Sequence, residues 1–438
     1  MSANQDYLPQ VRDQYEELPY PPRDPAHERH RLKFVPMDQL ASINARCFRG
    51  ARDLTAGMRV LVAGGGTGDS TVYLAEQLRD CSPHIVHLDL SATSIEVARQ
   101  RLSIRGLDNV HFVQGSLLDV RPDELGHFDY INCSGVLHHL ADPDAGLRAL
   151  VGVLAPEGCM GLMVYAQYGR TAHYQIQALM RLVNAEARSR VEKLSNLRRS
   201  LGSLHPHHWL RFSEHVAPTN DGNGELGDSG LYDIYLHEKD RAYTIPQVYE
   251  WMASHDLHIP GPPGDPTTRH QYDPRTYVKD PALLATIEAL PAATRYAIAE
   301  LMYGQIGRHI FYATRKAQSA ARLDDVHLCP TWLDDEGAGL GAKLIGESAD
   351  QLVLSHAGLR FTTTNTPEKL ALLRAIDGKR TTAALFAGQD LGAPALAPQM
   401  AMLEQLHSID AITLRAPEVP VPPSSRSLQL RVAQRFAP

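Results

Sequence analysis

The chain has 438 residues, enough for two or three domains and a substantial core. Its formal net charge of −7 argues against a protein dedicated to binding nucleic acid. The five cysteines are scattered without the spacing of a metal site, which favours a reduced, cytoplasmic setting. No basic and apolar leader is visible, and no window holds the roughly 18 to 20 apolar residues that a membrane span needs. We therefore expect a soluble cytoplasmic protein without a membrane partner.

Residues 1–52 are predicted to form an N-terminal extension. Its run of residues 18–25 contains four prolines, which fix the backbone in an extended rather than helical conformation. From this segment Tyr15, Tyr20 and Arg23 could reach a site in the core, so that the extension would act as a cap. A plain wrap over the surface is the alternative.

The most informative stretch is an apolar run, residues 60–63, that ends in a glycine-rich turn and leads into an amphipathic helix. Gly64, Gly66 and Gly68 follow a G-x-G-x-G pattern. A buried strand, a tight turn and a helix N-terminus together form a place where a ligand can approach bare backbone. Such a turn alone is weak evidence, because dinucleotide-binding enzymes contain similar strings.

Spacing strengthens this interpretation. A second apolar strand, residues 85–88, ends in Asp89, and an acid at this position usually binds ribose hydroxyls. The alternation of strands and helices then continues as far as Tyr165. The further segments are a helix at 91–102, strand 110–114 followed by Gly115-Ser116-Leu117-Leu118-Asp119, strand 128–134 followed by Gly135-Val136-Leu137-His138-His139, a helix at 143–154 and strand 158–165.

With these motifs in this order, the chain resembles the class I S-adenosylmethionine-dependent methyltransferases. The resemblance implies S-adenosyl-L-methionine as the cofactor. It implies that the glycine turn passes the methionine part of the cofactor, that Asp89 accepts the ribose hydroxyls, and that Ser116 borders the adenine. The implied cofactor-binding residues are Gly64, Gly65, Gly66, Gly68, Asp69, Asp89, Leu90, Ser116, Leu117, Cys133, Ser134 and Leu137. One departure is Val62, which stands where the family usually has an acid near the cofactor's ammonium group, and Asp69 is a possible substitute.

The core resumes late in the chain. A helix at residues 245–255, a short strand at 257–259, helices within 281–301 and a strand at 308–315 are predicted. By the resemblance, the two strands complete the family's sheet, with the last one antiparallel. The expected fold is therefore α/β, with a seven-stranded Rossmann-like methyltransferase sheet and a methyltransferase domain at residues 53–316.

A helical insertion after the fifth strand, about residues 171–243, is predicted to act as a lid above the carboxyl ends of the strands. Seven Lys or Arg residues lie between 181 and 211, which keeps RNA as a minor candidate partner. A solvated helix face is the preferred interpretation, because no aromatic residues interleave with the charges. The run of residues 205–209 has three histidines but no spaced second pair of ligands, so we expect no metal.

Residues 324–415 differ in pattern from the rest. Two short strands at 343–346 and 351–354, helices at 367–376 and 395–408 and a strand at 411–414 are predicted. This pattern resembles the winged-helix-like α+β domains that recognise peptides in ribosomal peptide modification pathways. Dimerisation, nucleic-acid binding and a purely structural role stay open, and residues 416–438 are expected to be a flexible tail.

Methyl transfer from a sulfonium needs alignment and, for an amine or phenol acceptor, a group that takes a proton. His139 is the preferred base. The candidate catalytic residues are His138, His139, Tyr165, His237 and Tyr243, and the candidate substrate residues are Tyr168, Arg170, Asp240 and Arg241. We expect a methyltransferase acting on an N or O nucleophile of a protein or peptide. The alternatives are a small-metabolite methyltransferase and a non-catalytic S-adenosylmethionine-binding interaction protein, and the oligomeric state stays open.

Overall fold

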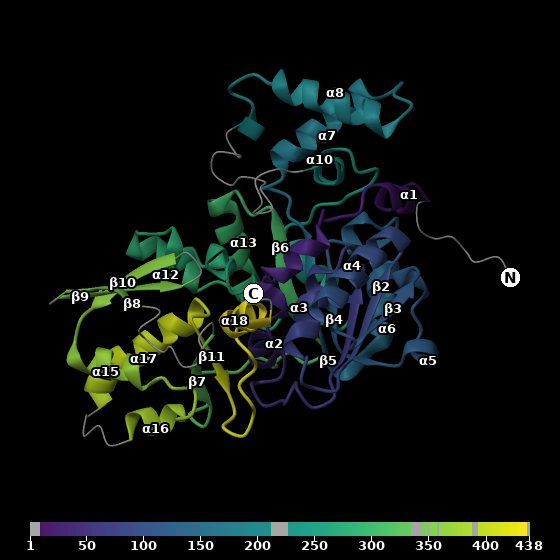
Figure 1. Cartoon of the computed structure of the whole chain (residues 1–438). Helices are drawn as coiled ribbons and strands as arrows, with labels where there is room; N and C mark the ends of the chain where they lie inside the picture. The colour runs from purple at the N-terminus through teal and green to yellow at the C-terminus, as the bar shows by residue number, and fades with distance from the viewer. Residues whose placement is uncertain are drawn as a thin grey trace.

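A six-stranded sheet forms the centre of the protein (Figure 1). The computed structural model describes residues 9–211, 227–333, 344–348, 350–356, 359–387 and 393–435. The strands lie in the order β3-β2-β1-β4-β5-β6, and only β6 runs antiparallel to its neighbour. Their bounds are β1 Arg59–Ala63, β2 His84–Asp89, β3 Val110–Gln114, β4 Phe128–Ser134, β5 Leu154–Tyr165 and β6 Arg308–Thr314.

Helices cover both faces of this sheet, which is why its central strands are almost continuously apolar. Side chains alternate along a strand, so Leu61 and Val62 face opposite layers. The Leu61 layer contains α6 (Pro143–Val153) and α11 (Ile245–Ala253). The Val62 layer contains α2 (Leu40–Cys47), α3 (Asp69–Gln77) and α4 (Ala92–Arg105). Two further helices, α12 (Pro281–Glu288) and α13 (Ala292–Tyr303), precede β6.

The short strand expected at residues 257–259 is reduced to a single bridge between His258 and Thr314. Pro260 follows immediately and has no N–H to continue a ladder. The α/β class is therefore confirmed, but the seven-strand prediction was wrong for the described part of the chain, whose central sheet has six strands.

The N-terminal extension lies across the glycine turn. It contains α1 (Pro9–Glu17) and two short 3-10 helices, η1 (Pro25–Arg29) and η2 (Pro36–Asp38). The amide of Thr67 donates to the carbonyl of Tyr20 at 3.3 Å, and the Thr67 hydroxyl donates to the carbonyl of Pro21 at 2.7 Å. This segment, residues 9–38, is called the strap below.

A buried cluster of charges fastens the strap to α4. Glu28 is 3% exposed and accepts hydrogen bonds from Arg101, at 2.8 Å, and from Arg105. Arg105 also donates to Glu76 at 3.2 Å, and Arg101 donates to Asp69 at 2.8 Å. Charges this deeply buried are tolerated only because each meets an opposite charge.

Replacing Glu28 with glutamine should lower the free energy of unfolding by about 3 to 5 kcal/mol, since two buried guanidinium groups lose their shared carboxylate. Urea denaturation followed by circular dichroism measures this loss. The matched control is Glu96→Gln, because Glu96 pairs with Arg99 at 3.8 Å on the exposed side of α4, the helix that carries Arg101 and Arg105. Its effect should stay below about 0.5 kcal/mol. Equal effects in the two variants would contradict a stabilising role for the cluster.

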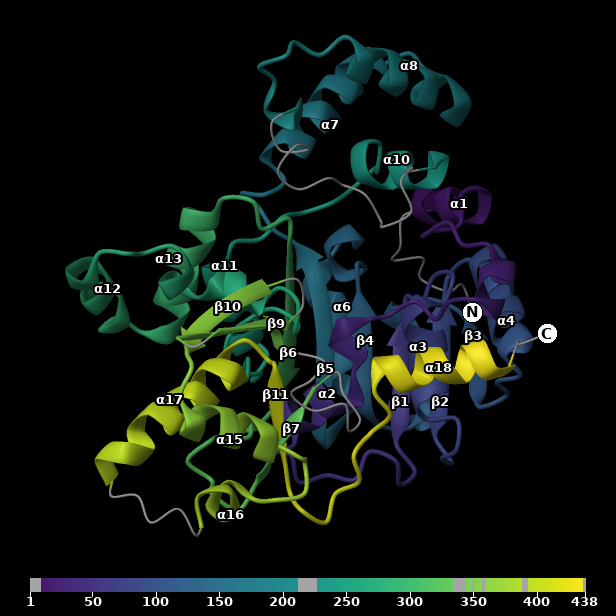
Figure 2. The ribbon, with the colours of Figure 1, turned by 60° about the vertical axis from the view of Figure 1, so that its left-hand side comes forward.

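The insertion forms a helical arm away from the sheet, at the top of Figures 1 and 2. It comprises α7 (Thr171–Val183), α8 (Arg190–Gly202) and α10 (Asp228–Tyr235), which share a small apolar core. Three of its basic residues form ion pairs with carboxylates: Arg190 with Glu17, Lys193 with Glu238 and Arg198 with Asp228. This pairing favours the solvated-face interpretation over a nucleic-acid patch.

The C-terminal part has its own apolar core. It contains a two-stranded sheet of β7 and β11 and an antiparallel three-stranded sheet in which β9 is central, one strand more than the expected hairpin. Lys343, where that hairpin was expected to start, lies outside the described residues. The element bounds are β7 Cys329–Trp332, β8 Leu344–Glu347, β9 Gln351–His356, β10 Leu359–Thr364, α15 Pro367–Ala375, α16 Thr382–Phe386, α17 Ala393–Ser408, β11 Ile412–Arg415 and α18 Ser425–Arg435. The winged-helix resemblance stays a prediction.

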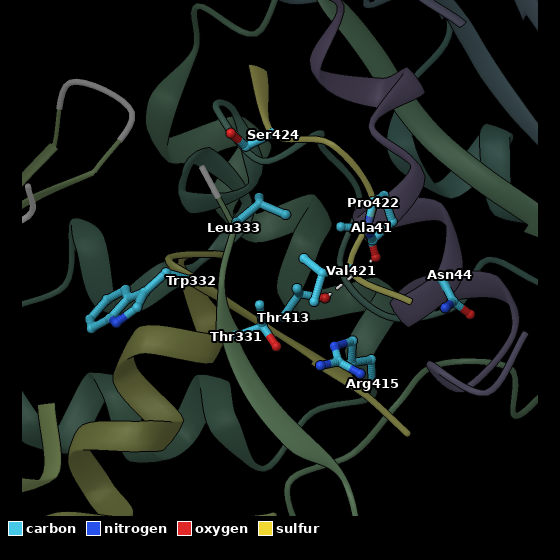
Figure 3. Close-up of a pocket in the computed structure, with 10 residues that line it drawn as sticks. All are labelled: Ala41, Asn44, Thr331, Trp332, Leu333, Thr413, Arg415, Val421, Pro422 and Ser424. Atoms are coloured by element: carbon cyan, nitrogen blue, oxygen red, sulfur yellow. Dashed lines mark hydrogen bonds between the residues drawn. The ribbon is translucent and has the colours of Figure 1, made fainter. Parts of the chain in front are cut away.

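Ion pairs tie this C-terminal part to helix α2 and to the segment that precedes α12. The carboxylate of Asp410 lies between the guanidinium groups of Arg46 and Arg269, all of them buried. A cavity of about 20 Å³, enough for one water, lies at the same junction beside Trp332 and Arg415 (Figure 3).

The expected flexible tail instead contains helix α18, which crosses the α3 side of the sheet in Figure 2. Leu428 and Val432 are buried in the Val62 layer. The prediction of a flexible segment was therefore wrong for residues 425–435, because Leu428 and Val432, four residues apart on one helix face, pack against an apolar surface. Among the described residues, no helix combines the length and the apolar character that crossing a bilayer requires.

Candidate functional site

A cavity of about 860 Å³ opens at the carboxyl ends of the parallel strands. In open α/β sheets, ligands bind at this edge, where the strand order reverses between β1 and β4. The glycine turn, the ends of β2 and β4, the strap and α10 all contribute to its wall.

The glycine turn leaves backbone, not side chains, at the cavity wall. Gly66 has φ +51°, and a Cβ there would lie 2.5 Å from the carbonyl oxygen of Tyr20. Gly64 and Gly65 line the cavity beside it. Gly68 does not line the cavity; a Cβ there would lie 2.8 Å from that of Ala98, so this glycine permits α3 and α4 to pack closely.

Asp89 ends β2 and lines the cavity next to Leu90. Its carboxylate accepts hydrogen bonds from the amides of Gly66 at 2.7 Å and Ser91 at 2.9 Å. Burial raises the pKa of Asp89, and these two bonds oppose the rise. The side chain is therefore held in place at the wall before any ligand arrives.

Of the other residues expected to bind the cofactor, some line the cavity and some are buried beneath its wall. Ser116, Leu117 and Ser134 line the cavity. Cys133 and Leu137 do not line it; both are fully buried in the Leu61 layer beneath the wall.

Asp69 lines the cavity but already binds two cations. It accepts hydrogen bonds from Arg23, at 2.9 and 2.7 Å, and from Arg101. Burial would raise the pKa of Asp69, but these two guanidinium groups lower it to about 2. Asp69 therefore holds the strap to the glycine turn.

Tyr15, Tyr165, Asp233 and His139 line another part of the cavity and belong to a network of tyrosine, histidine and carboxylate groups that also includes His237. The hydroxyls of Tyr15 and Tyr165 donate to the carboxylate of Asp233 at 2.8 and 3.1 Å. Burial, and then the charge of Asp233, raise the pKa of both tyrosines, which stay protonated. The rings of His139 and His237 stack on each other with centroids 3.8 Å apart.

Hydrogen bonds fix the tautomers of these two histidines. The Nδ1 of His139 lies 3.0 Å from the carbonyl oxygen of Lys239, so it carries the proton and Nε2 keeps the lone pair. The amide of Lys239 donates to Nδ1 of His237, so His237 carries its proton on Nε2, 3.4 Å from the Tyr15 hydroxyl. Burial lowers the pKa of His139, and that of His237 to about 4.

Ligand-type atoms of His139, Asp233 and His237 lie within 4.8 Å of one another, a spacing compatible with a metal. The tautomers oppose that function, because His237 would have to surrender either its Nε2 proton or its bond from Lys239. The arrangement fits proton transfer, because His139, with a lone pair on Nε2, and the Asp233 carboxylate line the same cavity.

The remaining candidates are placed around this network. His138 is fully buried behind Tyr165, with ring centroids 4.0 Å apart, and does not line the cavity. Arg170 lines the cavity and stacks on Tyr165 with its guanidinium carbon 3.5 Å from the ring centroid. Asp240 lies behind it and accepts a hydrogen bond from Gln177 at 2.9 Å.

His138, His237 and Asp240 do not line the cavity, and three further candidates also lie outside its wall. Tyr243 turns into the core, where its ring stacks on that of Trp251 at 5.1 Å. Arg241 is exposed above Tyr243, and Tyr168 is half-buried. Tyr243 is drawn inward because its backbone pairs with the end of β5, on the strand face opposite the cavity.

Sequence reasoning did not select Asp233 as a site residue. The residue lies within α10, where an acid in an amphipathic helix is indistinguishable from a surface charge. What marks Asp233 as a site residue is its burial, at 2% exposed, and this burial follows only from the packing of α10 against β5 and the strap.

The residues present fit the cofactor that the sequence resemblance implied. A side chain at Gly66 would fill the cradle, and Asp89 and Ser116 stand at the wall where a ribose and a base would be held. Residues 61–160 match a family described as a methyltransferase domain. This part of the chain is therefore a methyltransferase domain of the S-adenosylmethionine-dependent class.

The relatives extend beyond that domain. An uncharacterized protein, syc1184_c of a Synechococcus strain, is 34% identical over 260 residues, which are 59% of this chain and 60% of the relative. The tRNA 5-carboxymethoxyuridine methyltransferase of Escherichia coli is 34% identical over 120 residues, 27% of this chain and 44% of that protein. The chain thus spans 60% and 44% of the length of these two relatives.

Among solved structures, PKMT2 from Rickettsia typhi in complex with AdoHcy superposes with a TM-score of 0.60 at 18% identity. The match covers 88% of this chain and 76% of that one. At this identity it shows a common fold, which extends over most of both chains.

Proposed function

We propose that this chain transfers a methyl group from S-adenosylmethionine to an amine nitrogen of a protein or peptide. One observation carries the proposal: the Asp233 carboxylate, with its two tyrosines, faces the same cavity as the glycine turn and Asp89. The cofactor, when bound, would supply the methyl group on a sulfonium that leaves as a thioether. The residues of this chain must therefore orient the acceptor and handle its proton.

An amine acceptor matches the charges of this wall. A protonated amine is attracted to the buried Asp233 carboxylate and to the faces of Tyr15 and Tyr165. The lone pair on His139 Nε2 can take the proton that must leave nitrogen before or after methyl transfer. Because the pKa of His139 is lowered, that lone pair is available at neutral pH. An O nucleophile would use the same base but would gain nothing from Asp233.

A polypeptide acceptor is preferred because the chain has a separate C-terminal part with its own core, next to the methyltransferase domain. The predicted resemblance of this part to peptide-recognition domains gives it a task that a small-metabolite enzyme would not need.

A second candidate is an acidic small-molecule acceptor, which one observation favours. Arg170 lines the cavity and is 7% exposed; its Nη2 atom forms only a long ion pair with Asp240, at 3.8 Å, and its Nε atom lacks a hydrogen-bond partner among the described residues. A buried guanidinium with unused donors is suited to a carboxylate or phosphate.

Incubating the purified protein with methyl-labelled S-adenosylmethionine and a fractionated cell extract tests the proposal. We expect label in the polypeptide fraction, stable to mild base as an N-methyl group is and an ester is not. Label confined to small molecules would favour the Arg170 alternative. Cofactor binding without any methyl transfer would favour a non-catalytic binding protein.

Replacing Asp89 with alanine should weaken cofactor binding by about 2 to 3 kcal/mol, the scale of losing charge-assisted hydrogen bonds. Titration calorimetry with S-adenosylmethionine measures the change. Asp108→Ala is the matched control, because Asp108 is exposed beside β3, at the amino end of the strand. Wild-type affinity in the Asp89 variant would remove the ribose assignment.

A further inference from the structure

The end of β1 lacks an acid that could meet a positively charged group in the cavity. Val62 occupies this position and lines the cavity. In the sheet register Val62 lies opposite Asn132 of β4, which also lines the cavity. The two side chains project from the same face of the sheet, so Asn132 is the polar group next to the missing acid.

The acids that do line the cavity are engaged elsewhere. Asp69 binds Arg23 and Arg101, and Asp233 binds two tyrosines. Asp89 accepts two backbone amides, and Asp265 accepts hydrogen bonds from Thr267 and Thr268 in its own turn.

A fifth acid lies directly behind Asn132. Asp38, at the end of η2 in the strap, is fully buried. Its Oδ1 accepts hydrogen bonds from the Tyr130 hydroxyl at 2.6 Å and from Nδ2 of Asn132 at 2.8 Å. Its Oδ2 is buried without a hydrogen-bond partner in the part of the chain that the structure describes. An ion in this position carries a desolvation cost that a nearby cation would offset.

Asp38 also determines how Asn132 faces the cavity. Because Oδ1 of Asp38 accepts from both neighbours, the amide nitrogen of Asn132 must point toward Asp38. The carbonyl oxygen of Asn132 is then left as an acceptor on the cavity side of the residue. A carbonyl polarised by a carboxylate behind it is a good partner for an ammonium group.

We infer that Asn132, oriented by Asp38, binds the α-ammonium group of the cofactor in place of the acid missing at Val62. The inference rests on the proposed use of S-adenosylmethionine. It assigns to the strap a second task besides covering the glycine turn, since the strap delivers Asp38 to the cofactor site. Asn132 is then a binding residue and Asp38 a positioning residue.

The test compares two ligands within each variant: S-adenosylhomocysteine and its deaminated analogue, in which hydrogen replaces the amino group. Titration calorimetry of the full-length wild type should show a preference for the amino form of about tenfold or more, the scale of one charge-assisted hydrogen bond. Asn132→Leu should reduce this preference to less than about threefold. Asp38→Asn should reduce it partly. Asp129→Asn is the matched control, because Asp129 lies on the same strand, pairs with Arg52 and does not line the cavity.

The ratio of the two affinities is independent of any general loss of folded protein, so a destabilised variant still gives a valid measure of the preference for the amino group. An unchanged preference in Asn132→Leu would overturn the inference, as would its loss in Asp69→Asn instead. Asn132→Asp should retain or increase the preference, and its loss there would also contradict a role in ammonium binding. If the wild type binds neither ligand, the proposed function fails and the inference fails with it.

Discussion

Replacing Asp233 with asparagine should lower kcat by about a hundredfold, within the range that proton-handling groups contribute. The variant keeps the shape of the side chain but removes the charge that Tyr15 and Tyr165 surround. It also leaves an amide N–H₂ facing hydroxyls that already donate, so at least one group must turn. Cofactor affinity should change less than about threefold, because the hydrogen bonds of Asp233 go to Tyr15 and Tyr165 and not to the glycine turn. Single-turnover kinetics and titration calorimetry separate the two quantities.

Asp228→Asn is the control for this experiment. Asp228 lies on the same helix, α10, but pairs with Arg198 and is about half exposed, at 53% of its side chain. Its loss should leave kcat within about twofold of wild type, as expected for a surface ion pair. Normal turnover in the Asp233 variant would mean that the acceptor binds elsewhere, and the amine proposal would lose its main support.

Replacing Gly66 with valine should abolish detectable cofactor binding. The residue has φ +51°, which a β-branched side chain rarely adopts, and its Cβ would lie 2.5 Å from the Tyr20 carbonyl. The added methyl groups would fill the cradle or displace the strap, and either result removes the binding surface. We expect affinity to fall more than about a hundredfold, the effect of losing several contacts together.

Gly152→Val provides the comparison, because no atom lies within 4 Å of a Cβ at Gly152, on the outer side of α6. It tests whether any glycine-to-valine change in this domain disturbs binding through stability alone. Binding of S-adenosylmethionine by the Gly66 variant at wild-type affinity would exclude the glycine turn as the cofactor cradle.

The end of the C-terminal part is more tightly packed than its composition indicates. A proline- and serine-rich segment suggested a loose tail, yet Leu428 and Val432 of α18 complete the layer that contains Val62. Asp410 similarly ties the C-terminal part to Arg46 and Arg269. Removing the residues after 324 would therefore expose core and leave two arginines without their partner, so a truncation cannot separate recognition from stability.

The sequence by itself determined the strands β1 to β5, the glycine turn and the acid that ends β2. These features depend on local properties: apolar runs bounded by glycine, helical spacing of apolar residues and the positive φ that Gly66 adopts. It also located Asp89, Ser116 and Ser134 on the cavity wall, because each ends or follows a parallel strand and such strands end at one edge of the sheet.

Only the tertiary structure decided which distant residues meet. Tyr15 and Asp233 are 218 positions apart, and Asp38 and Asn132 are 94 apart, so no local pattern could pair them. The strand expected at residues 257–259 does not form beside β6, because Pro260 ends the pairing after one bridge. Tyr243 points into the core because its backbone pairs with the end of β5. Burial changed the chemistry of these groups: an acid in a helix pattern became a buried carboxylate, and two histidines were each fixed in one neutral tautomer. Solvation and long-range packing set those properties, and neither is encoded in the spacing of residues along the chain.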